Sequence, residues 1–287
     1  MLAIINKELR SYFASATGYI FMSFFLLISG IFFSITNLLG QNPLYNNVLS
    51  SITFIFLFVV PMLTMRLISE ETRQKTDQLL LTSPLKVSDI VLGKYFAALL
   101  LFLLTLLITV LYPIILSFYG NVAVGEVLGG YIGFFLLGAA FISVGLFISS
   151  LTENQVISAV VTVITLLVLW IMDGIIMGLP TDRKSSIVVV GILVIAIAAL
   201  LYYSTKNIYI SAGAIIIGAI AMVLLYVSNP AIYDGIILKL FQWFSLMERY
   251  QSFSFGIFDI SSVVYFITFS FAFIFLTIQT IEKRRWS

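Results

Sequence analysis

The sequence predicts an all-α protein that crosses a membrane several times, and three observations lead to this fold class. Hydrophobic residues make up 61% of the 287 residues, whereas charged residues make up only 10%. Apolar runs long enough for one membrane-spanning helix, roughly 17 to 25 residues, recur along the whole chain. A soluble protein of this size has no core large enough to bury so many apolar side chains, so lipid is the solvent for most of the chain.

Eight such runs are present, and each is predicted to form one membrane-spanning helix. The predicted spans are residues 18–37, 49–66, 94–117, 127–150, 155–178, 187–203, 208–227 and 260–281. Because eight is an even number, both termini should lie on the same side of the membrane. We treat residues 1–287 as a single transmembrane domain.

The basic residues indicate which side the termini face. Lys and Arg side chains near the ends of spans are retained in the cytoplasm. If the termini are cytoplasmic, eleven of the 15 Lys and Arg residues lie on the inner side and four lie on the outer side. The sequence therefore predicts a multi-pass protein of the cell membrane with both termini in the cytoplasm.

Residues 1–16 precede the first span and contain the stretch "LAIINKELRSYF". Apolar side chains recur at helical spacing on one face of this stretch, and polar side chains lie on the opposite face. The apolar face comprises Leu2, Ile5, Leu9, Tyr12 and Phe13, and the polar face comprises Asn6, Lys7 and Arg10. This pattern predicts an interfacial helix on the inner leaflet. A frayed N-terminal tail is the alternative.

The loop of residues 67–93, between the second and third spans, is unusually charged. Nine of the chain's 28 charged residues lie between Arg66 and Lys94, counting both ends. A short cytoplasmic helix with a charged face and an exposed apolar end is suited to dock in a groove of a partner protein. The alternative is a charged face that contacts only water.

This loop is predicted to form a helix, a sharp turn and a second helix. Ser69 would cap the first helix, which begins at Glu70 and ends with the three leucines at 79–81 before Pro84. The Ser-Asp pair at 88–89 would cap the second helix, which continues into the third span.

Residues 228–259 are rich in aromatic side chains and too interrupted by charge to cross the bilayer. They are predicted to form an amphipathic or re-entrant segment on the outer side. Two roles remain open. Interfacial aromatic residues can simply anchor the last span, or the segment could contribute to a path across the membrane.

Composition excludes several classes of site. The sequence contains no Cys and no His, which removes disulfides, thiolate nucleophiles, His-ligated metals and His-dependent catalytic triads. Its net charge of +2 is too small to suggest a nucleic-acid partner. The "SDIVLGKY" stretch lacks the upstream Gly and the following Ser or Thr of a phosphate-binding loop. We therefore expect no cofactor, no metal and no enzymatic activity in this chain.

Asp173, in "WIMDGIIMG", is essentially the one ionisable residue within the predicted spans. An acid within a membrane is usually functional, so Asp173 is a candidate for a path or gate. The alternative is an acid at the level of the interface that reaches water. A carrier coupled to an ion gradient would need more titratable groups near the bilayer midplane, which favours an external source of energy.

Small residues and prolines within the spans predict local packing. The pairs Gly129 with Gly133 and Gly174 with Gly178 are each spaced four apart and let helices approach closely. We expect these glycines to serve packing within the chain rather than contacts between chains. Pro61 and Pro113 are each expected to kink their helix.

Four stretches resemble one transporter family. "EETRQKTDQLLLTSPLKVSDIVLGK" resembles the cytoplasmic loop of type-2 ATP-binding-cassette (ABC) exporter permeases. "NKELRSYFASATGYI" is similar to their N-terminal helix, and "FISSLTENQVISA" is similar to the tight turn between their fourth and fifth spans. "VVYFITFSFAFIFLTIQTIEKRRW" resembles the C-terminal span of the gliding-motility subgroup. The resemblance covers residues 1–178 and 240–287.

The resemblance implies a permease domain whose loop couples to a separate ABC ATPase subunit. It also implies a dimer with a second permease copy or a related membrane subunit. The implied ATPase-coupling interface comprises Glu70, Glu71, Arg73, Lys75, Asp77, Leu79, Leu80, Leu81, Pro84, Thr152, Glu153 and Asn154. The predicted transmembrane hairpin of residues 187–227 is extra relative to the six-span pattern of this family.

Two other functions remain open from the residues alone. One is an ion-coupled secondary transporter, and the other is a structural membrane subunit that transports nothing. The substrate is not identified, although apolar and hydroxyl side chains favour an amphipathic molecule.

Overall fold

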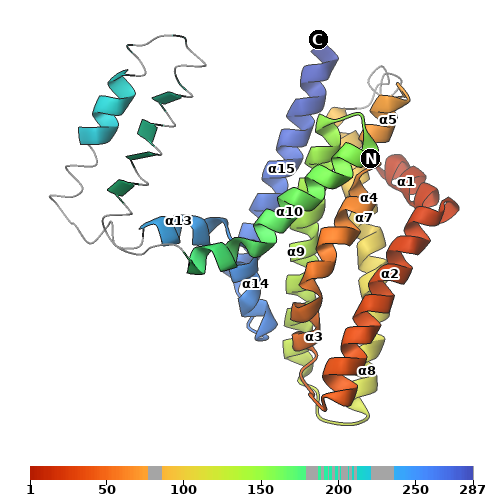
Figure 1. Cartoon of the computed structure of the whole chain (residues 1–287). Helices are drawn as coiled ribbons and strands as arrows, with labels where there is room; N and C mark the ends of the chain where they lie inside the picture. The colour runs from red at the N-terminus through yellow and green to blue at the C-terminus, as the bar shows by residue number, and fades with distance from the viewer. Residues whose placement is uncertain are drawn as a thin grey trace. The chain divides into compact units, whose positions relative to one another are not determined.

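The computed structural model describes residues 1–76, 86–178 and 236–286, together with residues 212–220 and short pieces between 187 and 209. The chain forms two compact units. Unit 1 comprises Met1–Trp170 and Leu246–Ser287, and unit 2 comprises Ile171–Ser245. Figure 1 shows the elements of both units.

The described elements of unit 1 are helical. From the N-terminus they are α1 (Leu2–Ala14), α2 (Ala16–Phe33), the π-helix η1 (Ser34–Leu39), α3 (Asn46–Ser51), the 3₁₀-helix η2 (Ile52–Ile55), α4 (Phe56–Thr64), α5 (Ser69–Arg73), α7 (Val87–Thr109), α8 (Leu111–Ser117), α9 (Val124–Leu151), α10 (Gln155–Met177), α14 (Leu246–Ser254) and α15 (Ile260–Trp286). Helix α10 continues into unit 2, which also contains α13 (Ile236–Phe244) and a helical segment at 212–220.

Within the described residues, six helical stretches are long and apolar enough to cross a membrane. They are Ala16–Leu39, Asn46–Arg73, Val87–Ser117, Val124–Leu151, Gln155–Ile176 and Ile260–Arg284. These stretches coincide with six of the eight predicted spans, and the all-α polytopic fold is confirmed. Only parts of the predicted spans at 187–203 and 208–227 lie within the described residues, so the count of eight stays a prediction.

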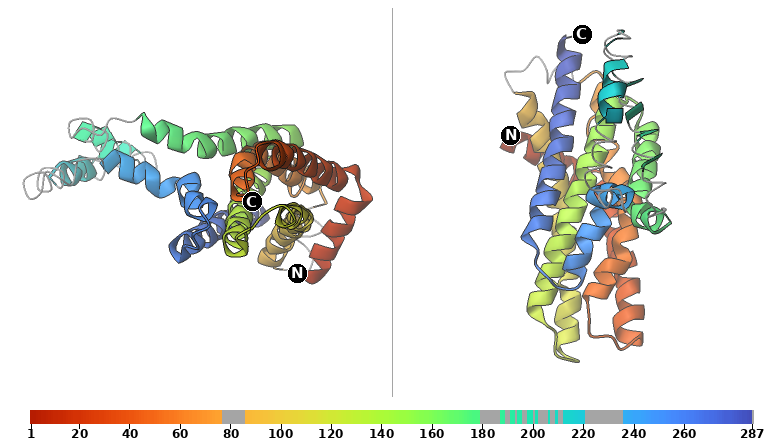
Figure 2. Two further views of the ribbon diagram at one scale, coloured as in Figure 1. Left: turned by 90° about the horizontal axis from the view of Figure 1, so that it is seen from below. Right: turned by 90° about the vertical axis from the view of Figure 1, so that its left-hand side faces the viewer.

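Helix α9 is the centre of unit 1. It packs against α4, α7, α14 and α15. In the most apolar 18 residues of α9, 78% are buried, compared with 17% in the corresponding part of α10. Figure 2 shows unit 1 from two further directions, with α15 and α14 running beside α9. The exposed apolar faces of α10, α2 and α15 are therefore the surfaces that lipid or another subunit would cover.

Glycines allow neighbouring helices to approach α9 closely. A Cβ at Gly133 would overlap the side chain of Phe253 in α14, and a Cβ at Gly129 would lie 3.4 Å from the carbonyl oxygen of Gly256. The predicted internal packing of this pair is confirmed. The second pair differs, because nothing among the described residues lies within 4 Å of a Cβ at Gly174.

Pro113 breaks the third span. Helix α7 ends at Thr109, four residues before this proline, and α8 begins at Leu111. Proline provides no N–H for the carbonyl four residues earlier, and its ring collides with that carbonyl. The expectation for Pro113 is met as an interruption of the helix at Val110, whereas Pro61 lies inside the uninterrupted helix α4.

The predicted segment 228–259 is divided between the two units. Residues up to 235 lie outside the described residues, and α13 belongs to unit 2. Helix α14 belongs to unit 1, where Leu246, Tyr250 and Phe253 are buried, and it packs against α9. The chain then turns at Gly256, which has a φ of +75°, and starts α15. Helix α14 is thus part of the helical bundle.

Candidate coupling site

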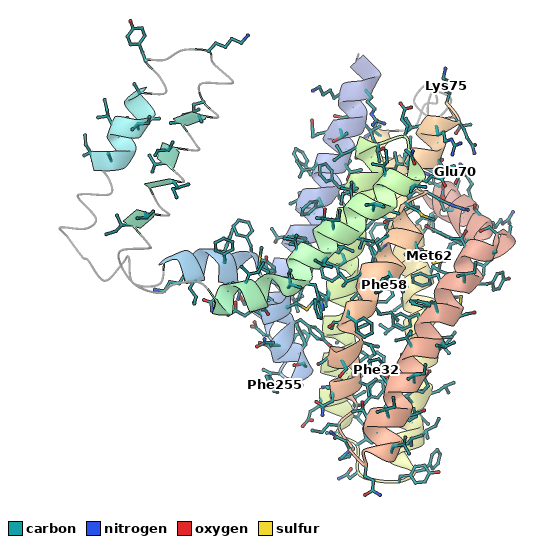
Figure 3. The ribbon with its side chains drawn as sticks, in the orientation of Figure 1. Phe32, Phe58, Met62, Glu70, Lys75 and Phe255 are labelled. Carbon is teal, nitrogen blue, oxygen red and sulfur yellow. The ribbon has the colours of Figure 1, made fainter. Side chains whose placement is uncertain are left out.

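The candidate site lies at one end of unit 1. The N-terminus, α5 and the C-terminal end of α15 occupy this end, at the top of Figure 1. Helix α1 packs against α7, and α5 packs against α9. Glu70 and Lys75 lie here as well (Figure 3). This end therefore brings the charged loop together with four other helices.

A cluster of charges around the buried Lys94 joins three of these helices. The Nζ atom of Lys94 in α7 lies 2.9 Å from Glu8 Oε1 in α1 and 2.9 Å from Glu71 Oε1 in α5. The Lys94 side chain is only 3% exposed. Lys7 Nζ lies 3.3 Å from the same Glu71 oxygen. The cluster contains two basic and two acidic side chains, so its formal charges cancel.

The cluster keeps a buried ammonium group paired. Burying an ammonium without a counter-charge is costly, so such groups are retained where they are paired and hydrogen-bonded. Two carboxylates from different helices fill this role for Lys94. The neighbouring Gly93 makes the arrangement possible, since a Cβ there would lie 2.8 Å from Ile4 Cγ2 of α1. Gly93 thus lets α1 pack closely against α7, and Lys94 pairs with the Glu8 carboxylate of α1.

Helix α1 is also fixed to α4. The Tyr12 hydroxyl donates a hydrogen bond to the Leu63 carbonyl oxygen at 3.1 Å. Burial, and secondly the Glu8 carboxylate, raise the pKa of Tyr12 well above its usual range. The hydroxyl therefore stays protonated and remains a donor. Tyr12 and Ile5, which the sequence places on the apolar face of α1, are both buried.

The start of α5 is capped from α9. Ser149 Oγ accepts hydrogen bonds from the backbone N–H groups of Ile68 and Ser69, each at 3.2 Å. The predicted cap was Ser69 itself, and that prediction is wrong. The Ser69 hydroxyl instead donates to the Met65 carbonyl of the preceding turn. A buried serine of another span therefore satisfies the first amides of the loop helix.

The loop helix also ends earlier than predicted. Helix α5 stops at Arg73, and Lys75 adopts a left-handed φ of 56°. Thr76 N donates to the Glu71 carbonyl at 3.0 Å, and Lys75 N donates to the Thr72 carbonyl at 3.1 Å. These two bonds form a Schellman motif, which normally uses glycine at the left-handed position. The prediction of a single helix from Glu70 through the leucines is therefore wrong.

The second predicted helix starts as expected but is capped differently. Helix α7 begins at Val87, with Lys86 as the N-cap residue and no side-chain hydrogen bond at the cap. Asp89 lies in its first turn, where an acid is favourable to the helix dipole. The predicted capping by Ser88 and Asp89 is wrong.

The remaining predicted interface residues are distributed as follows. Glu70 accepts a hydrogen bond from Gln74 Nε2 at 3.2 Å, and Glu71 belongs to the charge cluster. Arg73 and Lys75 are exposed. Five of the predicted residues lie outside the described residues, namely Asp77, Leu79, Leu80, Leu81 and Pro84.

The turn between α9 and α10 lies next to the same end. Thr152, Glu153 and Asn154 connect the two helices, beginning three residues after Ser149. Asn154 Oδ1 accepts the backbone N–H of Val156 at 2.9 Å and so caps α10. Glu153 and Asn154 are exposed. The predicted tight turn is confirmed, and its polar side chains are available at the surface.

Asp173 belongs to unit 2, where its carboxylate accepts a hydrogen bond from the Ser245 hydroxyl. No group of three acidic side chains that could hold a metal ion occurs among the residues that the structure describes. The structure therefore gives Asp173 a polar partner, and its role in a path or gate stays a prediction.

Sequence reasoning missed several residues of this end. Glu8 and Ser149 were not predicted, and neither was the contact of Arg284 Nη1 with Thr72 Oγ1 at 3.4 Å. One signal was present for Lys94. It follows the first two turns of an apolar helix, and a charge at such a position usually has a partner.

The chain was compared with known proteins. The model of the family described as "ABC-2 family transporter protein" matches residues 33–225, about two-thirds of the chain. The search of curated proteins found no match. The matched region includes α5, Lys94 and the α9–α10 turn, and it bears on type-2 permeases in general rather than on the gliding-motility subgroup. The chain belongs to the ABC-2 family of transporter proteins.

Proposed function

We propose that this chain is the membrane-spanning permease subunit of an ABC exporter of the cell membrane, driven by a separate ATPase subunit. Family membership and the six apolar helical stretches within the described residues support the transporter part. The 287 residues contain no phosphate-binding loop of the Walker A type. ATP hydrolysis would therefore occur in the partner, and a second permease copy or related subunit would complete the path.

The observation that carries the proposed coupling is the bridge from Glu71 through Lys94 to Glu8. The bridge connects the first turn of α5 to α7 and α1 within hydrogen-bonding distance. Ser149 connects the same turn to α9. A partner that displaces the loop would therefore move two spans and the N-terminal helix with it, because packed and paired elements shift together.

The surface that would meet the ATPase lies beside this bridge. Arg73, Lys75, Glu153 and Asn154 are exposed at the same end of unit 1. In this proposal the remaining loop residues, including Leu79, Leu80 and Leu81, complete the surface. The bias of Lys and Arg in the sequence favours a cytoplasmic location for this end.

Purification from native membranes in mild detergent tests the proposal. We expect a subunit with a nucleotide-binding sequence to co-purify and to hydrolyse ATP, and flux to follow ATP when the ion gradients are collapsed. The wild-type chain purified alone is the control and should show no ATP turnover. Flux that stops on addition of an uncoupler at constant ATP would instead support an ion-coupled transporter.

A further inference from the structure

Helix α8 is a short helix that a break separates from the long helix α7. At the break, the Val110 N–H donates to the Leu107 carbonyl, only three residues earlier, at 3.2 Å. Pro113 then has no N–H to donate to the Thr109 carbonyl. Prolines and short 3₁₀-type turns are the places where long helices bend. Val110 is therefore a bending point between α7 and α8.

The start of α8 is held against α2. The ring of Tyr112 stacks on the ring of Phe33, with 4.7 Å between the centroids and 13° between the planes. The Tyr112 hydroxyl also donates to the Leu26 carbonyl at 3.3 Å. Phe33 is the last residue of α2, and the π-helix η1 begins directly after it. The first and third spans are thus joined at a level where both leave regular α-helical geometry.

The far end of α8 is held much less firmly. Only Pro113 and Leu116 of its seven residues are buried. Phe118 and Tyr119, which follow the helix, are each 81% exposed. The Tyr119 N–H donates to the Leu116 carbonyl at 2.9 Å, so this turn continues from the helix. Elements with few buried apolar side chains are the ones that move at low cost. Helix α8 and its turn can therefore move as one body about the fixed start.

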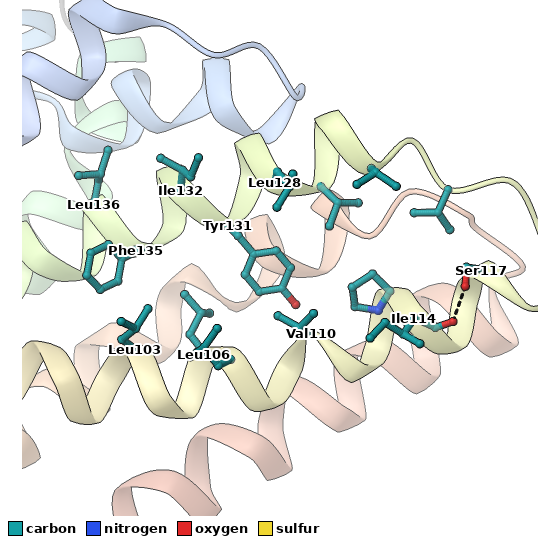
Figure 4. Close-up of a pocket in the computed structure, with 15 residues that line it drawn as sticks. Leu103, Leu106, Val110, Ile114, Ser117, Leu128, Tyr131, Ile132, Phe135 and Leu136 are labelled. Atoms are coloured by element: carbon teal, nitrogen blue, oxygen red, sulfur yellow. Dashed lines mark hydrogen bonds between the residues drawn. The ribbon is translucent and has the colours of Figure 1, made fainter.

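Open space borders α8 on two sides. An apolar groove of about 480 Å³ lies between α7–α8 and α9, and Figure 4 shows Ile114 of α8 and Leu128 of α9 on its walls. A second cavity, of about 470 Å³, is lined by Leu116 of α8 and by the polar side chains of Gln41 and Asn42 in the loop after η1. Protein interiors are otherwise close-packed. Helix α8 is thus a wall between an apolar groove and a partly polar cavity, with room to move toward either.

We propose that α8 is a hinged gate at the end of unit 1 opposite the coupling site. Bending at Val110 moves the far end of α8 toward α9, which closes the groove and widens the cavity beside η1. The reverse bend reopens the groove. That the gate controls passage at this end rests on the proposed transport function. The movement itself is a property of the chain and can be measured without an ATPase.

The expected movement is large enough to measure. Phe118 lies eight residues beyond Val110, which makes a lever of roughly 12 Å. A change in bend of about 20°, the size of a distinct helix kink, moves the end of this lever by roughly 4 Å.

Pairs of spin labels test the gate, since the chain has no Cys of its own. The reporting pair is Phe118→Cys with Phe255→Cys. Phe255 is 75% exposed and precedes Gly256, whose carbonyl oxygen would lie 3.4 Å from a Cβ at Gly129 of α9. The reference pair is Phe255→Cys with Leu104→Cys, which is 43% exposed on α7 before the break. We expect double electron–electron resonance to find two distances, roughly 4 Å apart, for the reporting pair and one distance for the reference pair.

Pro113→Ala restores an N–H for the Thr109 carbonyl and should stiffen the break. The reporting pair should then show a single distance. Pro61→Ala is the matched control, because Pro61 lies inside the uninterrupted helix α4, and both distances should persist. Thermal unfolding of the two variants shows whether either is misfolded. The wild-type pairs test the movement even where a variant fails to fold.

The distances are measured in the chain alone and, where an ATPase co-purifies, in the complex with and without ATP. A single distance for the reporting pair under every condition would overturn the gate. Two distances that persist in a folded Pro113→Ala chain would overturn it as well. So would two distances for the reference pair, which would show that α7 moves as a whole. Two distances for the reporting pair in a chain that binds no ATPase would support the gate and contradict the proposed function.

Discussion

Lys94 Nζ and Glu71 Oε1 lie 2.9 Å apart, although most of the charged loop lies between the two residues in the sequence. The contact joins the third turn of α7 to the first turn of α5, and Glu8 extends it to α1. Because Lys94 is buried, this ion pair differs from the many surface pairs that contribute little to stability.

Lys94→Met tests whether the bridge holds this end together. The substitution leaves the carboxylates of Glu8 and Glu71 with only the exposed Lys7 as a counter-charge. The loss of one partner of a buried pair destabilises a protein by about 3 to 5 kcal/mol. We expect a large decrease in the unfolding temperature of the detergent-purified protein.

Lys7→Met is the matched control, because the Lys7 side chain is 62% exposed and contacts the same carboxylate. Its effect should stay below about 1 kcal/mol. The triple variant Glu8→Gln, Glu71→Gln, Lys94→Met should recover most of the lost stability. Equal effects of Lys7→Met and Lys94→Met would contradict the assignment.

Ser149→Ala should loosen the start of α5. The backbone N–H groups of Ile68 and Ser69 would lose their acceptor, and a buried unsatisfied donor costs about 1 to 3 kcal/mol. Hydrogen exchange of the amides at 68–69 should accelerate. Ser150→Ala is the control, because the equally buried Ser150 bonds only within α9, to the Phe147 carbonyl. Similar exchange in both variants would mean that Ser149 is not the cap.

The sequence predicted the spans better than the candidate site, and the reason is physical. The length of an apolar run and the position of Pro113 are local properties, and both agree with the structure. The helix stop at Lys75 was missed because the left-handed position holds lysine where glycine is usual. The partners Glu8 and Lys94 are 86 residues apart, and helical periodicity carries no information on such contacts.

Asp259 gives a prediction on pH. Its carboxylate accepts hydrogen bonds from the Ser262 hydroxyl at 2.6 Å and from the backbone N–H groups of Ser261 and Ser262, which caps α15. The Ser262 hydroxyl, followed by the Ser261 amide, holds the pKa of Asp259 below its usual value. A lowered pKa in the folded state means that the stabilisation is present above the unfolded-state pKa and is lost as the pH falls through the folded-state pKa.

Asp259→Ala should therefore speed hydrogen exchange in the first turn of α15 at neutral pH. Exchange rates corrected for intrinsic pH dependence should converge with those of the wild type in acid, where the carboxyl group is protonated. Asp259→Asn is the informative control, since it keeps a capping oxygen without the titration. A difference between wild type and Asp259→Ala that persists unchanged in acid would exclude this role.

Single cysteines in this chain, which has none of its own, test the orientation. Tyr119 is 81% exposed in the loop after α8, and Glu153 is exposed in the turn after α9. If the coupling site is cytoplasmic, an impermeant thiol reagent should label Tyr119→Cys in intact cells. Glu153→Cys should be labelled only after permeabilisation. The reverse pattern would place the candidate site outside the cell.

Leu80→Asp tests the contact with the ATPase. If the leucines of the loop enter a groove of the partner, this substitution buries an unpaired carboxylate there, at a cost of roughly several kcal/mol. The ATPase should then fail to co-purify, and ATP turnover stimulated by the permease should be lost.

Reversing the charge of Arg73 or Lys75 should act differently, because both side chains are exposed. Pairs at the rim of an interface are screened by salt and contribute up to about 1 kcal/mol. These variants should weaken co-purification up to roughly fivefold at low salt and leave it nearly unchanged at high salt.

Since the loop lies outside the predicted spans, Leu80→Asp should still insert at normal abundance. A well-inserted Leu80→Asp chain that keeps the ATPase and its full turnover would mean that the energy of ATP reaches the spans through another surface. The exposed turn at Thr152–Asn154 would then be the next candidate, because it follows Ser149 directly on α9.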